Sequence, residues 1–172
     1  MDIQTAILTR RSTRKFTSDP VGEEMLETLL RAAMSAPSAG DEQPWHFLVI
    51  KDGEMLSRIP QINPNAAPAA NTTTAVLALG DLGLERYPGY WVLDLAAACE
   101  NLLLAAHGLG LGAVWTGIYP DQDRMKGFRK MFKLPKDIMP HSLILIGHPV
   151  NDGIYSERPD RFRKDRVHYD HW

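Results

Sequence analysis

Cysteine is nearly absent from this chain of 172 residues, which holds only Cys99. A lone thiol cannot form a disulfide within the chain, and it cannot supply the several thiolates of a cysteine zinc site or an iron–sulfur cluster. Because Cys99 lies in an alanine-rich helical sequence, we expect it to be an inert, buried thiol. Sparse cysteine is typical of a reducing compartment, so we expect a cytoplasmic protein.

The sequence also lacks a long uninterrupted apolar segment. The longest one, residues 92–115, is broken by Asp94, Glu100 and His107, so it predicts a buried helix followed by a strand and no membrane span. The first fifteen residues lack the apolar core of a signal peptide. We therefore expect neither a cleaved leader nor a membrane partner.

Net charge is small as well, at −2, but its distribution is uneven. Arg10, Arg11, Arg14 and Lys15 lie within six residues, and residues 151–172 hold five more basic residues against five acidic ones. These two stretches carry an excess of four positive charges on an otherwise acidic chain. No basic stripe interleaved with aromatic residues is present, so nucleic-acid binding through the basic ends is the less favoured alternative.

What the chain does have is 44% apolar residues, enough for one compact core over residues 1–172. Helical spacing and capping predict helices at 2–9, between the Asp19-Pro20 turn and Pro37, at 91–107 and at 121–132. Strands are predicted at 45–51, 74–80, 113–118 and 142–147, and a long loop at 60–74. The order of these elements favours an α+β domain, with residues 151–172 docking as an extension. The helix at 91–107 is apolar almost all round, which indicates a central helix or a subunit interface.

Two stretches of the sequence contain residues that could bind a ligand. Residues 10–14, Arg-Arg-Ser-Thr-Arg, suit a phosphate clamp, because guanidinium groups and a hydroxyl donate to phosphate oxygens. On composition alone, a solvated basic helix end is the favoured interpretation of these residues. Residues 36–45 combine a proline stop, small residues and Gln43, which suits a flat heterocycle with polar edges but is also ordinary turn chemistry.

Taken together, four motifs in order resemble the nitroreductase family of flavin enzymes. They are Arg-Arg-Ser-x-Arg-x-Phe at 10–16, Pro-Ser-x-x-x-x-Gln-Pro-Trp at 37–45, Trp-Thr-Gly at 115–117, and a C-terminal stretch with Arg161-Phe162, residues 166–169 and Trp172. The resemblance covers nearly the whole chain. It implies a central mixed, mainly antiparallel sheet flanked by helices, in an intertwined homodimer that holds FMN at the subunit interface.

The resemblance also implies roles for individual residues. Arg10, Arg11, Ser12 and Arg14 match positions that grip the phosphate, ribityl chain and pyrimidine edge, and Arg161 and Arg163 match positions that complete the phosphate site. Pro37, Ser38 and Ala39 match a loop that packs on the flavin from the other subunit, with Gln43 near it, and Thr116 and Gly117 match a backbone segment whose amides face the ring edge. Either Asn63 or Asn65 would contact the pyrimidine edge, with Asn65 named as the candidate, and Asp41 and Trp115 complete the set. Asp41 departs from the family, which usually has asparagine there, and a carboxylate only accepts hydrogen bonds unless it is protonated.

The implied activity is hydride transfer from NADH or NADPH through FMN to a small-molecule acceptor such as a nitroaromatic or a quinone, with ping-pong kinetics. Because the flavin carries the hydride, we assign no catalytic acid or base. The alternative is a flavin-binding store or redox sensor without turnover. His168 and His171 have a spacing that is common by chance, so we assign no metal site.

Overall fold

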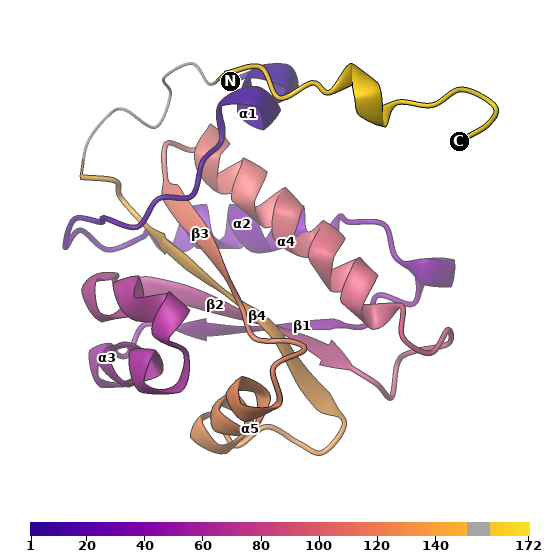
Figure 1. Cartoon of the computed structure of the whole chain (residues 1–172). Helices are drawn as coiled ribbons and strands as arrows, with labels where there is room; N and C mark the ends of the chain where they lie inside the picture. The colour runs from indigo at the N-terminus through magenta and orange to yellow at the C-terminus, as the bar shows by residue number, and fades with distance from the viewer. Residues whose placement is uncertain (151–158) are drawn as a thin grey trace.

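The computed structural model describes residues 1–150 and 159–172 (Figure 1). Its helices are α1 (Ile3–Thr9), α2 (Glu23–Met34), α3 (Gly53–Ile62), α4 (Trp91–Gly108) and α5 (Gln122–Met131). Its strands are β1 (Trp45–Ile50), β2 (Thr74–Asp81), β3 (Gly112–Gly117) and β4 (Ile138–Gly147). Short 3₁₀ helices lie at η1 (Ala39–Asp41), η2 (Pro64–Asn71) and η4 (Lys164–Arg166).

The four strands form one sheet in the order β1-β2-β4-β3, and each neighbouring pair is antiparallel. Side chains of a strand alternate between its two faces, and β2 is buried on both. Val76 and Ala78 enter one core cluster, whereas Leu77 and Leu79 enter the other. The central position of β2 thus explains why its sequence is almost continuously apolar.

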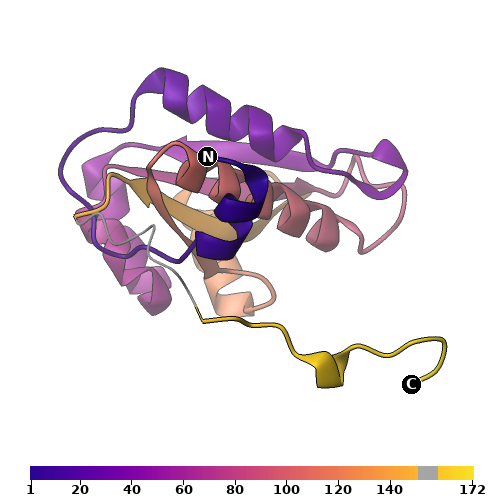
Figure 2. The same cartoon turned by 90° about the horizontal axis from the view of Figure 1, so that it is seen from above.

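Helices cover both faces of this sheet and close the two cores (Figures 1 and 2). One core packs α2 and α4 against the sheet, and the other packs α3, η2 and α5 against the opposite face. Strands and helices do not alternate as crossover units. The predicted α+β domain with an antiparallel sheet flanked by helices is therefore confirmed.

Aspartate side chains begin three of the helices. Asp2 accepts a hydrogen bond from the Thr5 N–H over 3.0 Å, Asp52 caps α3, and Asp121 caps α5. Each carboxylate satisfies an amide that the first turn leaves without a helical partner, and it also interacts favourably with the helix dipole. Capping of the first helix by Asp2 agrees with the prediction.

The predicted loop at 60–74 is wrong. Pro60 lies within α3, and Pro64–Asn71 forms η2. Leu56 and Ile59, three positions apart, are fully covered in the second core, and this burial outweighs the hydrogen bond that Pro60 cannot donate. Helix α3 was not predicted at all, because Pro60 and its polar residues resemble a loop.

The described part of the tail, residues 159–172, is exposed throughout and extends away from the sheet in both views (Figures 1 and 2). Phe162, Tyr169 and Trp172 contribute nothing to either core, and the Trp172 side chain is fully exposed. Residues 151–158, which belong to the predicted docking extension, lie outside the described residues. Docking of this segment stays a prediction. Within the described ranges, no helix is long and apolar enough to span a membrane.

Candidate functional site

The basic segment, residues 10–15, follows α1 in the chain and contacts the start of β3 in space. Ser12 forms a parallel bridge with Ala113, and the Thr13 N–H donates to the Ala113 carbonyl over 2.9 Å. Phe16 then bridges Pro149, just beyond β4. These backbone contacts fix the segment across one end of the sheet and leave the Ser12 and Arg14 side chains exposed.

Arg10 and Arg11 lie toward the C-terminal half of α4. Arg10 Nε donates to Glu100 Oε1 over 3.1 Å, in a partly exposed pair of the kind that contributes little stability. Burial and then the charges of Arg10 and Arg11 lower the pKa of His107, so this imidazole is neutral near pH 7. Of the four residues predicted to grip a phosphate, Ser12 and Arg14 are the more accessible.

A second candidate element is the loop at 37–43, between α2 and β1. Gly40, Asp41 and Gln43 all have positive φ angles, of 52°, 57° and 47°, and such backbone is held only when its surroundings determine it. Ser38 Oγ accepts from the Gln43 N–H over 3.0 Å, and Gln43 Nε2 donates to Asp41 Oδ1 over 2.8 Å. The Asp41 carboxylate therefore already accepts one of the two amide donors of Gln43.

This loop is anchored on a pair of buried acids, Glu42 and Asp94. Asp94 Oδ1 accepts from the Ala39 N–H over 3.0 Å, and Glu42 Oε2 accepts from the amides of Arg86 and Tyr87 over 2.6 and 3.1 Å. Burial, followed by the neighbouring Glu42 carboxyl, raises the pKa of Asp94, against the hydrogen bond from Ala39, which lowers it. Burial thus shifts Asp94, between the loop and the first turn of α4, toward its neutral form relative to a free carboxyl.

We expect Asp94→Asn to stabilise the fold by about 1 kcal/mol at pH 8 and to change it little at pH 4. A carboxyl whose folded pKa is raised contributes stability below its unfolded pKa and loses it as the pH rises through the folded value. Asparagine keeps the acceptor for Ala39 without an ionisable proton. Urea unfolding of the flavin-free protein at both pH values measures the difference, with the exposed Asp137→Asn as control. Equal destabilisation at both pH values would show that a carboxylate is needed there.

The third candidate element is the end of β3. The Trp115 ring lies 5.6 Å from the ring of His141, whose pKa burial lowers to about 4, and the buried Thr116 hydroxyl donates to the Leu143 carbonyl over 2.9 Å. Thr116 is buried, whereas Trp115 and Gly117 are both half-buried. A Cβ added at Gly117 would meet no atom within 4 Å, and its φ lies outside the left-handed region. Neither packing nor conformation therefore requires glycine there, and its lack of a side chain leaves the backbone approachable.

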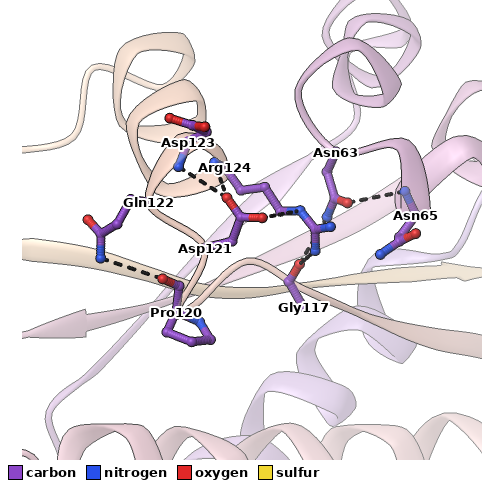
Figure 3. A network of polar contacts seen from close by, with 8 residues as sticks. All are labelled: Asn63, Asn65, Gly117, Pro120, Asp121, Gln122, Asp123 and Arg124. Carbon is purple, nitrogen blue, oxygen red and sulfur yellow. Dashed lines mark hydrogen bonds and ion pairs between the residues drawn. The ribbon is translucent and has the colours of Figure 1, made fainter.

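Polar side chains surround the carbonyl of Gly117 (Figure 3). Asn63, fully buried, donates through Nδ2 to this oxygen over 3.1 Å and accepts from the Asn65 N–H over 3.2 Å. Asn65, the predicted ligand residue, has an exposed side chain in the same cluster. The sequence leaves open whether Asn63 or Asn65 contacts the flavin. In the structure Asn63 binds the Gly117 carbonyl, whereas the Asn65 side chain is exposed.

The predicted C-terminal contributors lie on the exposed tail. Arg161 lines a groove together with Thr5 and Leu8 of α1, the helix that leads into the basic segment. Arg163 precedes η4 and is exposed.

The structure thus brings part of the predicted set together. The basic segment contacts β3 at Ala113, and Gly117 is the last residue of the same strand. Ala113 and Gly117 are about 13 Å apart along this extended strand. Pro37, Ser38 and Ala39 belong instead to the loop held by α4. Glu42, Asp94 and Arg124 were not predicted as site residues. For Asp94 the signal was available, because a carboxylate interrupts an otherwise apolar helix.

Two further observations concern groups assigned no role. Cys99 is buried, and burial raises the pKa of its thiol to about 11, which agrees with an inert residue. Among residues 1–150 and 159–172, no three histidine, cysteine or acidic side chains form a group that could hold a metal ion.

Comparison with known proteins gives consistent matches over the whole chain. The Nitroreductase family model matches residues 7–82 and 82–148. A relative from Methanothermobacter thermautotrophicus, "Putative NADH dehydrogenase/NAD(P)H nitroreductase", is 46% identical over 100% of this chain and 88% of its own length.

Solved structures agree with the fold. "Putative NADH Oxidase" from Clostridium acetobutylicum is 38% identical with a TM-score of 0.93, over 97% of this chain and 99% of that one. An FMN-dependent nitroreductase from Clostridium difficile is 25% identical with a TM-score of 0.87, over 97% of this chain and 99% of that one.

Proposed function

The chain belongs to the nitroreductase family, and from this premise we propose that it is an FMN-dependent oxidoreductase. It takes a hydride from NADH or NADPH and passes electrons to a nitroaromatic, a quinone or a similar small acceptor. The observation that carries the proposal is the placement of two open features on one strand: the exposed Ser12 and Arg14 beside Ala113, and the unobstructed backbone of Gly117 at the other end of β3. The names of the relatives support the same chemistry.

The donor set suits FMN, which is an elongated molecule with a phosphate at one end and a flat ring at the other. A phosphate needs several cationic or neutral donors, and Ser12 and Arg14 are exposed next to Arg10 and Arg11. A flat ring needs a smooth surface, and Gly117 offers backbone without a side chain. The separation of about 13 Å along the strand suits an extended ligand.

FMN, when bound, would supply the hydride chemistry, and the chain would bind and orient it. Ser12, Arg14 and Arg161 would hold the phosphate through cationic and hydroxyl donors. The backbone of Thr116 and Gly117 would donate to the ring edge without acting as a base. No side chain is needed as a nucleophile or as a general acid.

The site is proposed to lie between two copies of the chain. The resemblance to the family implies that the loop at 37–43 packs on the flavin of the other subunit, so a second copy would supply this loop to the first. Large apolar side chains are left exposed on α1 and on the tail, including Ile3, Leu8, Phe162 and Trp172. A homodimer would cover them. Sedimentation equilibrium tests this part independently of cofactor content.

The proposal is tested first by the absorption spectrum of the purified protein and by chromatography of the acid-released cofactor. We expect a yellow protein that releases FMN. Anaerobic mixing with NADH and then with NADPH should bleach it and reveal the preferred donor. Initial rates at several fixed acceptor concentrations should give parallel reciprocal plots, as expected when both substrates use one face in turn. Intersecting plots would rule out ping-pong turnover.

The alternative, a flavin store or redox sensor without turnover, predicts a yellow protein that neither nicotinamide reduces at a useful rate. A colourless protein that binds no added FMN would contradict both readings. These three outcomes are separated by the spectrum and the anaerobic mixing alone.

A further inference from the structure

The carbonyl of Gly117 is held more tightly than a strand end requires. It accepts from two side chains at once, Asn63 Nδ2 over 3.1 Å and Arg124 through one terminal guanidinium nitrogen, also over 3.1 Å (Figure 3). One of these donors is buried and neutral, and the other is a cation. Charge-assisted hydrogen bonds are roughly twice as strong as neutral ones, so Arg124 is the stronger partner.

The same peptide group is also held at its nitrogen end. The Ile118 N–H donates to the His141 carbonyl over 3.2 Å, and the Tyr119 N–H donates to the same oxygen over 3.0 Å. The Gly117–Ile118 peptide is therefore fixed on both sides, by α5 and η2 through its oxygen and by β4 through its nitrogen. Its plane cannot rotate without breaking at least one of these contacts.

Arg124 is itself fixed in place. Its Nε lies 3.2 Å from Asp121 Oδ2, and the other carboxylate oxygen of Asp121 accepts from the Arg124 N–H over 3.0 Å. The Arg124 side chain is about one quarter exposed, so its position is set by these partners rather than by solvent. Asp121 thus caps α5 and orients the guanidinium toward β3 with one carboxylate.

We propose that Arg124 is a positioning residue for the flavin site, acting through the Gly117 carbonyl and supported by Asp121 and Asn63. The inference rests on the proposed function, in which the backbone at Gly117 faces the ring. With the peptide fixed, the backbone donors at 116–117 keep one direction while substrates exchange on the opposite face. Without Arg124, Asn63 alone holds the oxygen and the segment gains freedom to rotate.

The chain offers a matched control on the same helix. Arg129 also donates from α5 to backbone carbonyls, those of Ile138, Pro135 and Lys136, over 2.7 to 3.1 Å, and none of them belongs to the candidate site. Arg124→Gln and Arg129→Gln each remove one cation of α5 that binds backbone oxygens. Only the first touches Gly117.

The first measurement uses amide hydrogen exchange in the flavin-free protein. For Arg124→Gln we expect the exchange of Ile118 and Tyr119 to accelerate about tenfold relative to Val114 in the middle of β3, because the local opening becomes easier. For Arg129→Gln the exchange at Ile118 and Tyr119 should follow the wild type. Unchanged exchange in Arg124→Gln would overturn the proposal, whatever the cofactor content.

The second measurement follows the flavin-loaded proteins. In Arg124→Gln we expect the rate of reduction by the preferred nicotinamide to fall about 10- to 100-fold, because small misplacements of aligned groups have effects of this size. FMN affinity should fall about threefold or less, since the phosphate contacts remain. Arg124→Lys, which keeps the charge, should recover part of the rate. Equal losses in affinity and rate, or equal effects in Arg129→Gln, would indicate a merely structural role.

The two proposals fail separately. If wild-type protein neither binds FMN nor is reduced, the proposed function fails. The exchange experiment would still show whether Arg124 restrains the backbone at Gly117. If wild-type protein turns over normally and Arg124→Gln behaves like it, only the positioning role is wrong.

Discussion

Replacement of Arg14 and Arg161 together by alanine is expected to abolish retention of FMN during purification. Arg14 is exposed on the segment that bridges β3, and Arg161 lies on the tail beside α1. In the proposed site both guanidinium groups donate to the phosphate. Hydrogen bonds to charged groups contribute about 1.5–3 kcal/mol each, so loss of two should weaken FMN binding at least about 100-fold.

The decisive measurement compares FMN with riboflavin, which has the same ring but no phosphate. Wild-type protein should bind FMN far more tightly than riboflavin, whereas the double variant should bind the two with similar affinity. The difference for the wild type should also shrink as salt is added, because the exposed part of the interaction is electrostatic. A fluorescence titration of both ligands provides these affinities directly.

Loss of any two positive charges could weaken the binding of an anionic ligand such as FMN, so a charge-matched control is needed. Lys126 and Lys136 are both exposed, one on α5 and one in the loop that follows it. Lys126→Ala plus Lys136→Ala should leave the preference for FMN intact. If the Arg14 and Arg161 variant still purifies with full flavin, the phosphate assignment is wrong.

Most of the fold was predictable because its elements obey local rules. Asp2 before an apolar helical face, Pro37 after α2 and the continuous apolar run of β2 each specify an element without knowledge of the rest. Pro60 shows where such rules end. A proline normally terminates a helix, but burial of Leu56 and Ile59 keeps α3 intact, and that burial depends on a sheet formed by residues far along the chain.

Candidate site residues stand out in the sequence where they are consecutive, as at 10–14 and 115–117. In the structure the first stretch contacts β3 through the Ser12–Ala113 bridge, and the second forms the end of that strand. Arg124 had no such signal, because it acts only where α5 meets the end of β3, and the sequence alone could not decide between Asn63 and Asn65. Glu42 and Asp94 are 52 positions apart in sequence, so their joint burial follows from the fold and not from either local sequence.

The Asp94 pair also bears on the role of the loop. Because Asp94 holds Ala39 and Glu42 holds the turn at 86–87, the loop is fixed to its own chain even though its proposed ligand belongs to the partner copy. Preorganisation of this kind lowers the entropy lost on binding. Asp41 is exposed on the loop, where its carboxylate accepts from Gln43 Nε2 and still faces solvent.

Gly117→Val is expected to remove flavin binding while leaving the fold intact. The φ of Gly117 suits any residue, an added Cβ meets no atom within 4 Å, and β-branched residues favour strands. The free energy of unfolding of flavin-free protein should therefore stay the same or rise by about 0.4–1 kcal/mol. In the flavin complex the new methyl groups would occupy the surface on which the ring is proposed to lie.

The loss of FMN affinity should increase with the size of the side chain at position 117. Overpacking costs about 1–3 kcal/mol, so Gly117→Ala should lower the affinity for FMN about tenfold and Gly117→Val about 100-fold. The affinity for riboflavin should fall by the same factor, because the obstruction is at the ring and not at the phosphate. This result would distinguish the effect from the loss of Arg14 and Arg161. Gly53→Ala is the matched control, because Gly53 also has open space around it and lies on α3 away from the site. Unchanged FMN affinity in Gly117→Val would show that the ring does not lie against this strand end, and the site would then have to be sought elsewhere on the chain.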